Sequence, residues 1–198
     1  MRRGDWTQWS PVALLGMDLH SATLGIVGLG RIGLAVAKRA KGFSMRVLYH
    51  SRTRNLDCES RLGLEWVDNL SGLLSKSDFV SVHVPLNEKT RGMIDRKQLA
   101  EMKPTAVLVN TARGEIINQE ALYQALRDGA IGGAALDVTD PEPIPRDDPL
   151  LALDNVVITP HIGSASHATR VRMATLAAQN ILDVIQGHPP TYCVNPEA

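Results

Sequence analysis

The 198-residue sequence has few cysteines, no excess of charge of either sign and no long apolar run. Cys58 and Cys193 lie far apart in the chain, without disulfide or metal-ligand spacing, which fits a reducing cytoplasm and predicts no metal site. The 21 basic residues balance the 21 acidic ones, so neither nucleic acid nor an anionic membrane is expected as the main partner. No apolar stretch approaches the roughly 20 residues of a membrane span. The opening residues do not read as a signal peptide, because no apolar core follows their two arginines.

The most informative stretch is GLGRIG at residues 28–33, which follows a short apolar run. This is the pattern G-x-G-x-x-G between an expected strand and an expected helix. Gly28 allows the tight turn, Gly30 lets a pyrophosphate approach the backbone, and Gly33 lets the helix pack close to the strand. The N–H groups at the start of the helix favour the phosphate charge. The turn therefore predicts a dinucleotide site, with an ordinary strand–helix turn as the alternative.

Strands and helices alternate along the rest of the chain. The expected strands are apolar runs at residues 24–27, 45–49, 79–84, 106–110, 133–138 and 156–158. Helices are expected over residues 69–76, 96–102 and 118–127, after the glycine turn as far as Gly42, and over a long amphipathic stretch stopped by Gly187. In the helix after the turn, the apolar residues at helical spacing are Ile32, Ala35, Val36 and Ala40. The alternation predicts an α/β fold, a Rossmann-type doubly wound parallel sheet with helices on both faces.

The loop after the second expected strand carries no acidic residue. In a dinucleotide-binding unit an Asp or Glu commonly stands about 20 residues after the glycines and binds the ribose hydroxyls of NAD. Ser51, Arg52, Thr53 and Arg54 stand there instead. Arginine and hydroxyl groups attract a 2′-phosphate, which a carboxylate would repel. The loop therefore predicts a preference for NADP(H), with NAD(H) still possible, and a solvated basic loop is the alternative.

Three ionisable residues, Arg113, Glu142 and His161, each follow the end of an expected strand. An arginine can bind a carboxylate, a histidine can donate a proton near neutral pH, and a neighbouring glutamate favours the imidazolium. Each residue alone could be a surface charge. Together with a nicotinamide they predict hydride transfer to a 2-oxo acid, with His161 as proton donor, Glu142 as its support and Arg113 as the substrate anchor. Asp137, at another strand end, is expected to accept a hydrogen bond from the nicotinamide amide.

Four strings, GIVGLGRIG, VNTARGEIIN, ALDVTDPEP and TPHIGSAS, resemble the D-isomer-specific 2-hydroxyacid dehydrogenase family. The strings WTQWSPVALLGMDL and SRTR are similar to the glyoxylate/hydroxypyruvate and 2-ketogluconate reductases within it. The resemblance implies an NAD(P)-dependent reductase of the EC 1.1.1 type that converts a small 2-oxo acid into a D-2-hydroxy acid, and it again places catalysis on Arg113, Glu142 and His161. The family's cofactor contacts fall on Leu29, Gly30, Arg31, Ile32, Ser51, Arg52, Thr53, Pro85, Thr111, Ala112, Arg113, Asp137, His161, Ile162 and Gly163.

The resemblance also implies a division of the chain. In the family, half of a substrate domain precedes the arm, and that half is absent from this sequence. We expect residues 1–18, with Trp6 and Trp9, to form an interdomain or dimer arm, residues 19–165 the NAD(P)-binding domain, and residues 166–198 the helix and tail of the substrate domain. The apolar face of the last helix predicts a homodimer or another partner. Cofactor binding is expected to survive with weak or absent turnover, and the alternative is a non-catalytic dinucleotide-binding or interaction module.

Overall fold

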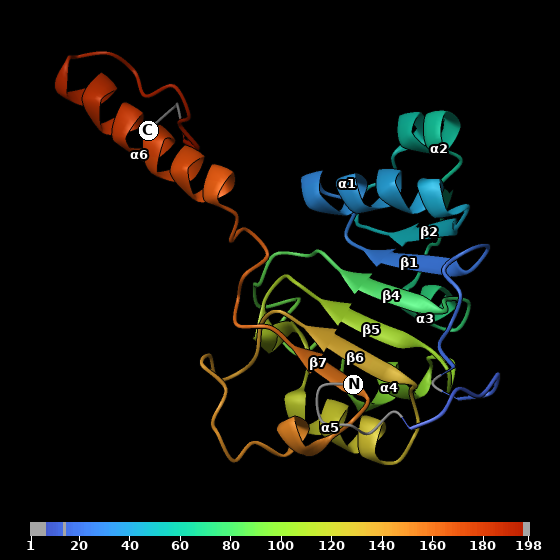
Figure 1. The fold of residues 1–198 in the computed structure, drawn as a ribbon. Helices are drawn as coiled ribbons and strands as arrows, with labels where there is room; N and C mark the ends of the chain where they lie inside the picture. The colour runs from blue at the N-terminus through green and yellow to red at the C-terminus, as the bar shows by residue number, and fades with distance from the viewer. Residues whose placement is uncertain (1–6, 14, 196–198) are drawn as a thin grey trace.

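The computed structural model describes residues 7–13 and 15–195, so Trp6 lies outside the described residues. Seven parallel strands form one sheet in the order β3-β2-β1-β4-β5-β6-β7 (Figure 1). The strands are β1 (Thr23–Val27), β2 (Arg46–His50), β3 (Glu65–Trp66), β4 (Phe79–Val82), β5 (Val107–Asn110), β6 (Gly133–Leu136) and β7 (Val156–Ile158). The α-helices are α1 (Arg31–Ala40), α2 (Leu56–Leu62), α3 (Leu70–Leu74), α4 (Arg96–Ala100), α5 (Gln119–Arg127) and α6 (His167–Ile185). The strand order reverses at β1, which confirms the predicted doubly wound α/β fold.

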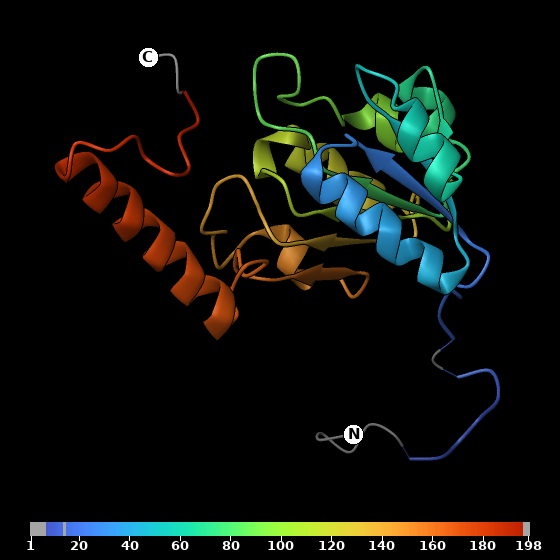
Figure 2. The same ribbon diagram turned by 90° about the horizontal axis from the view of Figure 1, so that it is seen from above.

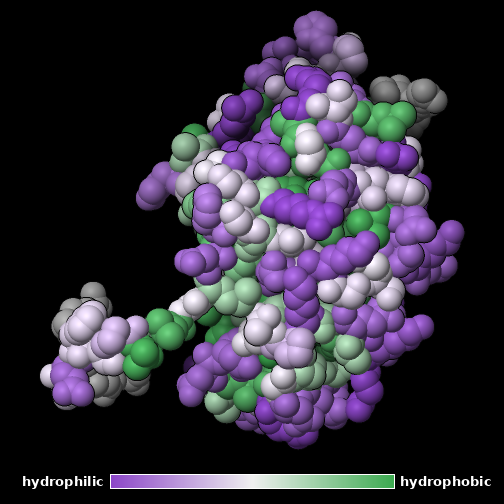
Figure 3. Space-filling model, turned by 90° about the vertical axis from the view of Figure 1, so that its right-hand side faces the viewer, coloured by the Kyte–Doolittle hydropathy of each residue, from purple (hydrophilic) through white to green (hydrophobic). Residues whose placement is uncertain are grey.

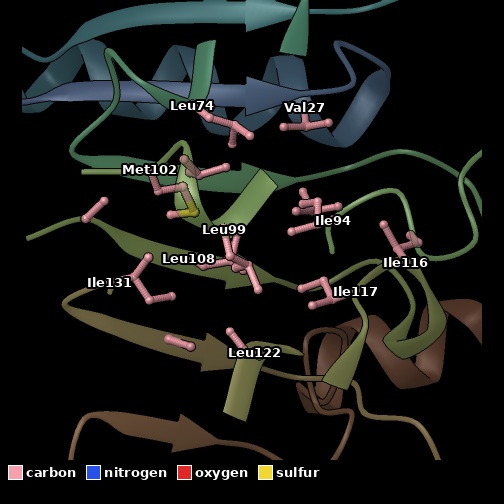
Figure 4. Close-up of a cluster of buried hydrophobic side chains, with 14 of the residues drawn as sticks. Val27, Leu74, Ile94, Leu99, Met102, Leu108, Ile116, Ile117, Leu122 and Ile131 are labelled. Carbon is pink, nitrogen blue, oxygen red and sulfur yellow. The ribbon is translucent and has the colours of Figure 1, made fainter. Parts of the chain in front are cut away.

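The sheet is packed on both faces because successive strand residues point to opposite sides. Ile26 and Tyr49 belong to a buried cluster that includes residues of α1 and α2. Their sequence neighbours Val27 and Leu48 belong to a larger cluster that includes residues of α3, α4 and α5. Figure 4 shows this larger cluster around Leu99, Leu108 and Leu122, among other residues. The sheet therefore has a rigid centre, from which the loops at the strand ends extend.

One predicted helix face is wrong in detail. The spacing placed Ile32 on the buried face of α1, but Ile32 is 66% exposed, and the buried residues are Gly33, Ala37 and Ala40. A methyl group at Gly33 would overlap the carbonyl oxygen of Gly28, so α1 contacts the turn through Gly33. Ile32, one position earlier, points away from that contact.

Among the strands and α-helices of the described residues, α2 and β3 were not predicted. Asn55 caps the start of α2, since its side chain accepts the N–H of Cys58 at 3.0 Å, and Gly63, with φ of +60°, follows the last residue of the helix. These are ordinary helix start and stop signals. Strand β3 has only two residues, too few for an alternating pattern to be visible in the sequence.

Helix α6 lies apart from the sheet in two perpendicular views (Figures 1 and 2). Its apolar residues Val171, Ile181 and Ile185 are exposed, and they lie on the helix for which the sequence predicted an apolar face. The N-terminal arm also projects from the body of the molecule (Figures 2 and 3), and Trp9 on it is 76% exposed. Among the described residues, no helix is both long and apolar enough to cross a membrane.

Candidate active site

The carboxyl ends of all seven strands lie along one edge of the sheet, because every strand pair is parallel. The glycine turn follows β1 at this edge (Figure 1), and Arg113, Glu142 and His161 follow β5, β6 and β7 there. Glu142 and His161 are in contact, with 2.6 Å between Oε1 and Nδ1. Arg113 is exposed, and its Nη1 donates to the carbonyl of Ala112 at 2.6 Å. Within the described residues, Arg113 forms no ion pair with Glu142.

The glycine turn combines two tight positions with one open position. Gly28 has φ of +98°, and a methyl group there would lie 2.9 Å from the carbonyl oxygen of His83. Gly33 is confined more tightly still, by the carbonyl oxygen of Gly28. At Gly30 a methyl group would meet nothing within 4 Å, and no side chain caps the start of α1 at this residue. The turn therefore leaves bare backbone at a helix N-terminus without an acidic residue in its first turn, which fits a phosphate group.

The loop at residues 51–54 holds its side chains in different surroundings. Ser51 Oγ donates to the carbonyl of Thr53 at 2.6 Å. Arg54 binds both carboxylate oxygens of Glu59, at 2.8 and 2.7 Å. Arg52 is exposed and makes no hydrogen bond or ion pair within the part of the chain that the structure describes. The sequence pattern does not distinguish Arg52 from Arg54, but in the described part of the chain Arg54 is paired with a carboxylate and Arg52 is not.

His161 has an unusual backbone conformation as well as a charged neighbour. Its φ is +52°, in the left-handed region that side chains other than glycine seldom adopt. Its N–H donates to the carbonyls of Asp137 and Thr159, both at 3.0 Å. The His161 and Glu142 side chains are 49% and 40% exposed. Strained backbone held by its surroundings is common at functional sites, so the conformation supports a functional role for this loop.

Asp137 braces the loop that carries His161. Its buried carboxylate accepts hydrogen bonds from the Thr159 hydroxyl at 2.6 Å and from the N–H groups of Ile162 and Gly163, both at 2.8 Å. Burial alone would raise the pKa of Asp137, but these hydrogen bonds and the nearby His161 hold it below its usual range. A carboxylate offers about four lone-pair sites and three are used here, so the expected bond to a nicotinamide amide stays a prediction.

Sequence reasoning missed Asn110, whose side chain forms hydrogen bonds to the backbone of the turn that carries Arg113. The Asn110 side chain is buried; its Oδ1 accepts the N–H of Ala112 at 3.0 Å, and its Nδ2 donates to the carbonyl of Arg113 at 2.9 Å. The available signal was weak: an asparagine at the end of a strand, a residue type that often bonds to nearby backbone.

Gly114 and Gln119 were also missed, and they join the Arg113 and Glu142 loops. A methyl group at Gly114 would overlap the carbonyl of Thr139, so the two loops touch. Gln119 Oε1 accepts the N–H of Asp140 at 3.0 Å, while its Nε2 donates to Asp148 at 2.9 Å. Nothing local in the sequence marks either contact, because each joins residues more than 20 positions apart.

The other residues expected to contact a cofactor lie in the loops and first helical turn at this edge and are at least partly exposed; they are Leu29, Arg31, Ile32, Pro85, Thr111, Ala112, Ile162 and Gly163. Their accessibility is compatible with ligand contact, and their roles stay predictions. Across residues 7–13 and 15–195, no group of three His, Cys, Asp or Glu side chains is placed to hold a metal ion.

Comparison with known proteins gives a consistent result. Residues 1–163 match the family model described as the NAD binding domain of D-isomer specific 2-hydroxyacid dehydrogenases. The chain is 55% identical over 198 residues to a glyoxylate reductase of Korarchaeum cryptofilum, covering 100% of this chain and 59% of that protein. It is 46% identical over 199 residues to glyoxylate/hydroxypyruvate reductase B of Salmonella newport, covering 100% of this chain and 61% of that protein.

A solved structure, the TT0316 protein of Thermus thermophilus, superposes with a TM-score of 0.92 at 51% identity, over 98% of this chain and 60% of that one. The chain therefore spans about 60% of the length of each of these relatives.

Proposed function

Because the chain belongs to the D-isomer specific 2-hydroxyacid dehydrogenase family, we propose that it binds NADP(H) and supplies the proton-donating part of a site that reduces a small 2-oxo acid. The observation that carries this proposal is the contact between His161 and Glu142, at 2.6 Å, on the edge of the sheet that also carries the glycine turn. Glyoxylate and hydroxypyruvate are the proposed substrates, since relatives named as reductases of these two acids align along the whole chain.

The glycine turn is the proposed pyrophosphate site. Gly30 leaves room at the start of α1, where N–H groups and the helix dipole favour negative charge. When bound, the nicotinamide supplies the hydride. The loop at residues 51–54 is the proposed 2′-phosphate site, and the absence of an acidic residue there supports NADP(H) over NAD(H).

His161 is the proposed proton donor. Glu142 occupies the Nδ1 side of the ring, which leaves Nε2 as the nitrogen that can donate a proton to a forming alkoxide. The Arg113 guanidinium is the proposed partner of the substrate carboxylate, which it can bind through two parallel hydrogen bonds.

We propose the same three-part organisation that the sequence suggests: an arm at residues 1–18, the nucleotide-binding domain at 19–165, and a helix and tail at 166–198 that contact another surface. The exposure of Val171, Ile181 and Ile185 on α6 and of Trp9 on the arm supports such contacts. A homodimer is the proposed assembly.

A titration with NADPH and NADH, followed by an assay of NADPH oxidation with glyoxylate and with hydroxypyruvate, tests the proposal. We expect both dinucleotides to bind, NADPH more tightly, and slow oxidation that the substitution His161→Gln removes. His167→Gln is the matched control, because His167 is an exposed histidine at the start of α6. If neither dinucleotide binds, the proposal is wrong.

A second candidate, a dinucleotide-binding module without catalysis, is favoured by one observation. Glu142 and His161 remain 40–49% exposed, whereas hydride transfer sites generally exclude water. NADPH binding with no oxidation above the His161→Gln background would support this second candidate.

A further inference from the structure

Arg54 is held by two neighbouring side chains. Its Nε and Nη2 donate to the two carboxylate oxygens of Glu59 at 2.8 and 2.7 Å, the forked geometry that guanidinium groups form with carboxylates. Its guanidinium carbon lies 5.4 Å from the ring centre of Trp66, within the range of a cation–π contact. The charge of Arg54 is therefore already compensated and its direction is fixed.

Glu59 is itself anchored in the fold. Its Oε1 also accepts the hydroxyl of Tyr49 at 2.8 Å, and its side chain is only 14% exposed. Tyr49 is fully buried near the end of β2, and its oxygen accepts the N–H of Asn55 at 2.7 Å. The pair of Arg54 and Glu59 thus belongs to a network that joins β2 to the start of α2.

Arg52 lies two residues away in different surroundings. It is exposed and unpaired within the described part of the chain, and it lies between two residues whose turn is closed by the bond from Ser51 Oγ to the carbonyl of Thr53. Among residues 7–13 and 15–195, an anion that approaches the loop meets a cation without an ion-pair partner at Arg52 and a neutral ion pair at Arg54. Because a compensated pair attracts an anion much less than a free charge does, the two arginines cannot contribute equally.

We infer that Arg52, and not Arg54, binds the 2′-phosphate of the cofactor. Glu59 acts as a positioning residue: it binds Arg54 and keeps it away from the phosphate, and in this way it sets the preference for NADPH over NADH. The inference rests on the proposed use of NADP(H), and it makes Glu59 a determinant of cofactor specificity although it does not touch the phosphate. Removing the negative charge of Glu59 frees a second cation beside the phosphate.

The test is calorimetric titration of four variants with NADPH and with NADH, and the quantity compared is the ratio of the two affinities. Arg52→Gln should lower the NADPH-to-NADH ratio about 10- to 100-fold, as expected for the loss of one charge-assisted contact. Replacing Arg54 and Glu59 together by glutamine leaves the net charge unchanged and should keep the ratio within about threefold. Glu59→Gln alone should raise the ratio, by about three- to tenfold. Arg61→Gln is the control, because Arg61 forms an exposed pair with Asp57 on the same helix.

Each outcome decides the inference. A double variant that loses the ratio as strongly as Arg52→Gln makes Arg54 a phosphate ligand and overturns the assignment. If the Glu59→Gln variant shows no rise in the NADPH-to-NADH affinity ratio, the role assigned to Glu59 is wrong. This variant tests that role even if the double variant fails to fold. A wild-type chain that binds both dinucleotides equally overturns the inference and the NADP(H) preference together. A chain that binds neither overturns the proposed function as well.

Discussion

The substitution Gly30→Ala separates binding from folding. A methyl group at Gly30 meets nothing within 4 Å and the residue has φ of −78°, so alanine fits the unliganded chain. We expect the free energy of unfolding to change by less than about 1 kcal/mol, since the main cost is a less suitable helix cap. In the complex, the same methyl group occupies the surface against which the pyrophosphate would lie. Overpacking of this kind costs about 1–3 kcal/mol, or roughly 10- to 100-fold in NADPH affinity.

Two other glycines serve as comparisons for Gly30→Ala. Gly33→Ala should destabilise the fold by roughly 1–3 kcal/mol, because its methyl group overlaps the carbonyl of Gly28. Gly42→Ala should change neither property, because Gly42 is open and lies beyond the far end of α1. Thermal denaturation and calorimetric titration with NADPH measure the two effects. A folded Gly30→Ala variant with wild-type affinity would refute the placement of the pyrophosphate at this turn.

Three further predictions concern the loops around the candidate site. Gly114→Ala should lower the free energy of unfolding by roughly 1–3 kcal/mol in urea titration, because the methyl group overlaps Thr139; an unchanged value would contradict the close packing of the two loops. Asn110→Asp should destabilise by about 1–3 kcal/mol and weaken glyoxylate use, because the carboxylate cannot donate to the carbonyl of Arg113, and wild-type behaviour would exclude the bracing role. The pKa of Asp137 is lower in the folded chain than in the unfolded chain. The charged carboxylate therefore contributes to the free energy of unfolding above the unfolded pKa of about 3.9, and this contribution is lost as the pH falls through the pKa of the folded chain. The difference in unfolding free energy between wild type and Asp137→Asn should thus be about 1.5–3 kcal/mol at pH 7 and shrink toward pH 3, and a difference independent of pH would contradict the anchoring by a charged carboxylate.

Much of the fold follows from local signals in the sequence. Apolar runs mark the strands, and cap residues such as Asn118 and stop residues such as Gly129 mark the helix ends. The candidate site follows from one general property of parallel sheets, that successive strands end at the same edge. That property alone predicts that Glu142 and His161 approach one another, although they are 19 positions apart.

The hydrogen bonds and ion pairs that hold the site loops in place do not follow from local signals in the sequence. Asp137 bonds to residues 22–26 positions away, and only the packing of β6 against β7 brings these groups together. The difference between Arg52 and Arg54 depends on α2 and β3, the two elements that sequence reasoning missed. The charged residues of the site, including Glu142 beside His161, were therefore visible in the sequence. The contacts by which Asn110 holds the Arg113 turn and Glu59 neutralises Arg54 required the structure.

The central claim is that the glycine turn and His161 form one site in which a bound dinucleotide reduces a 2-oxo acid. The most direct test is single-turnover oxidation of bound NADPH after glyoxylate is added, followed by absorbance, because this detects even slow chemistry. The account predicts glyoxylate-dependent oxidation by the wild-type chain and a fall of at least about 100-fold with His161→Gln, the typical contribution of a positioned proton donor. Equal rates for wild type and His161→Gln, with NADPH bound equally by both, would contradict it.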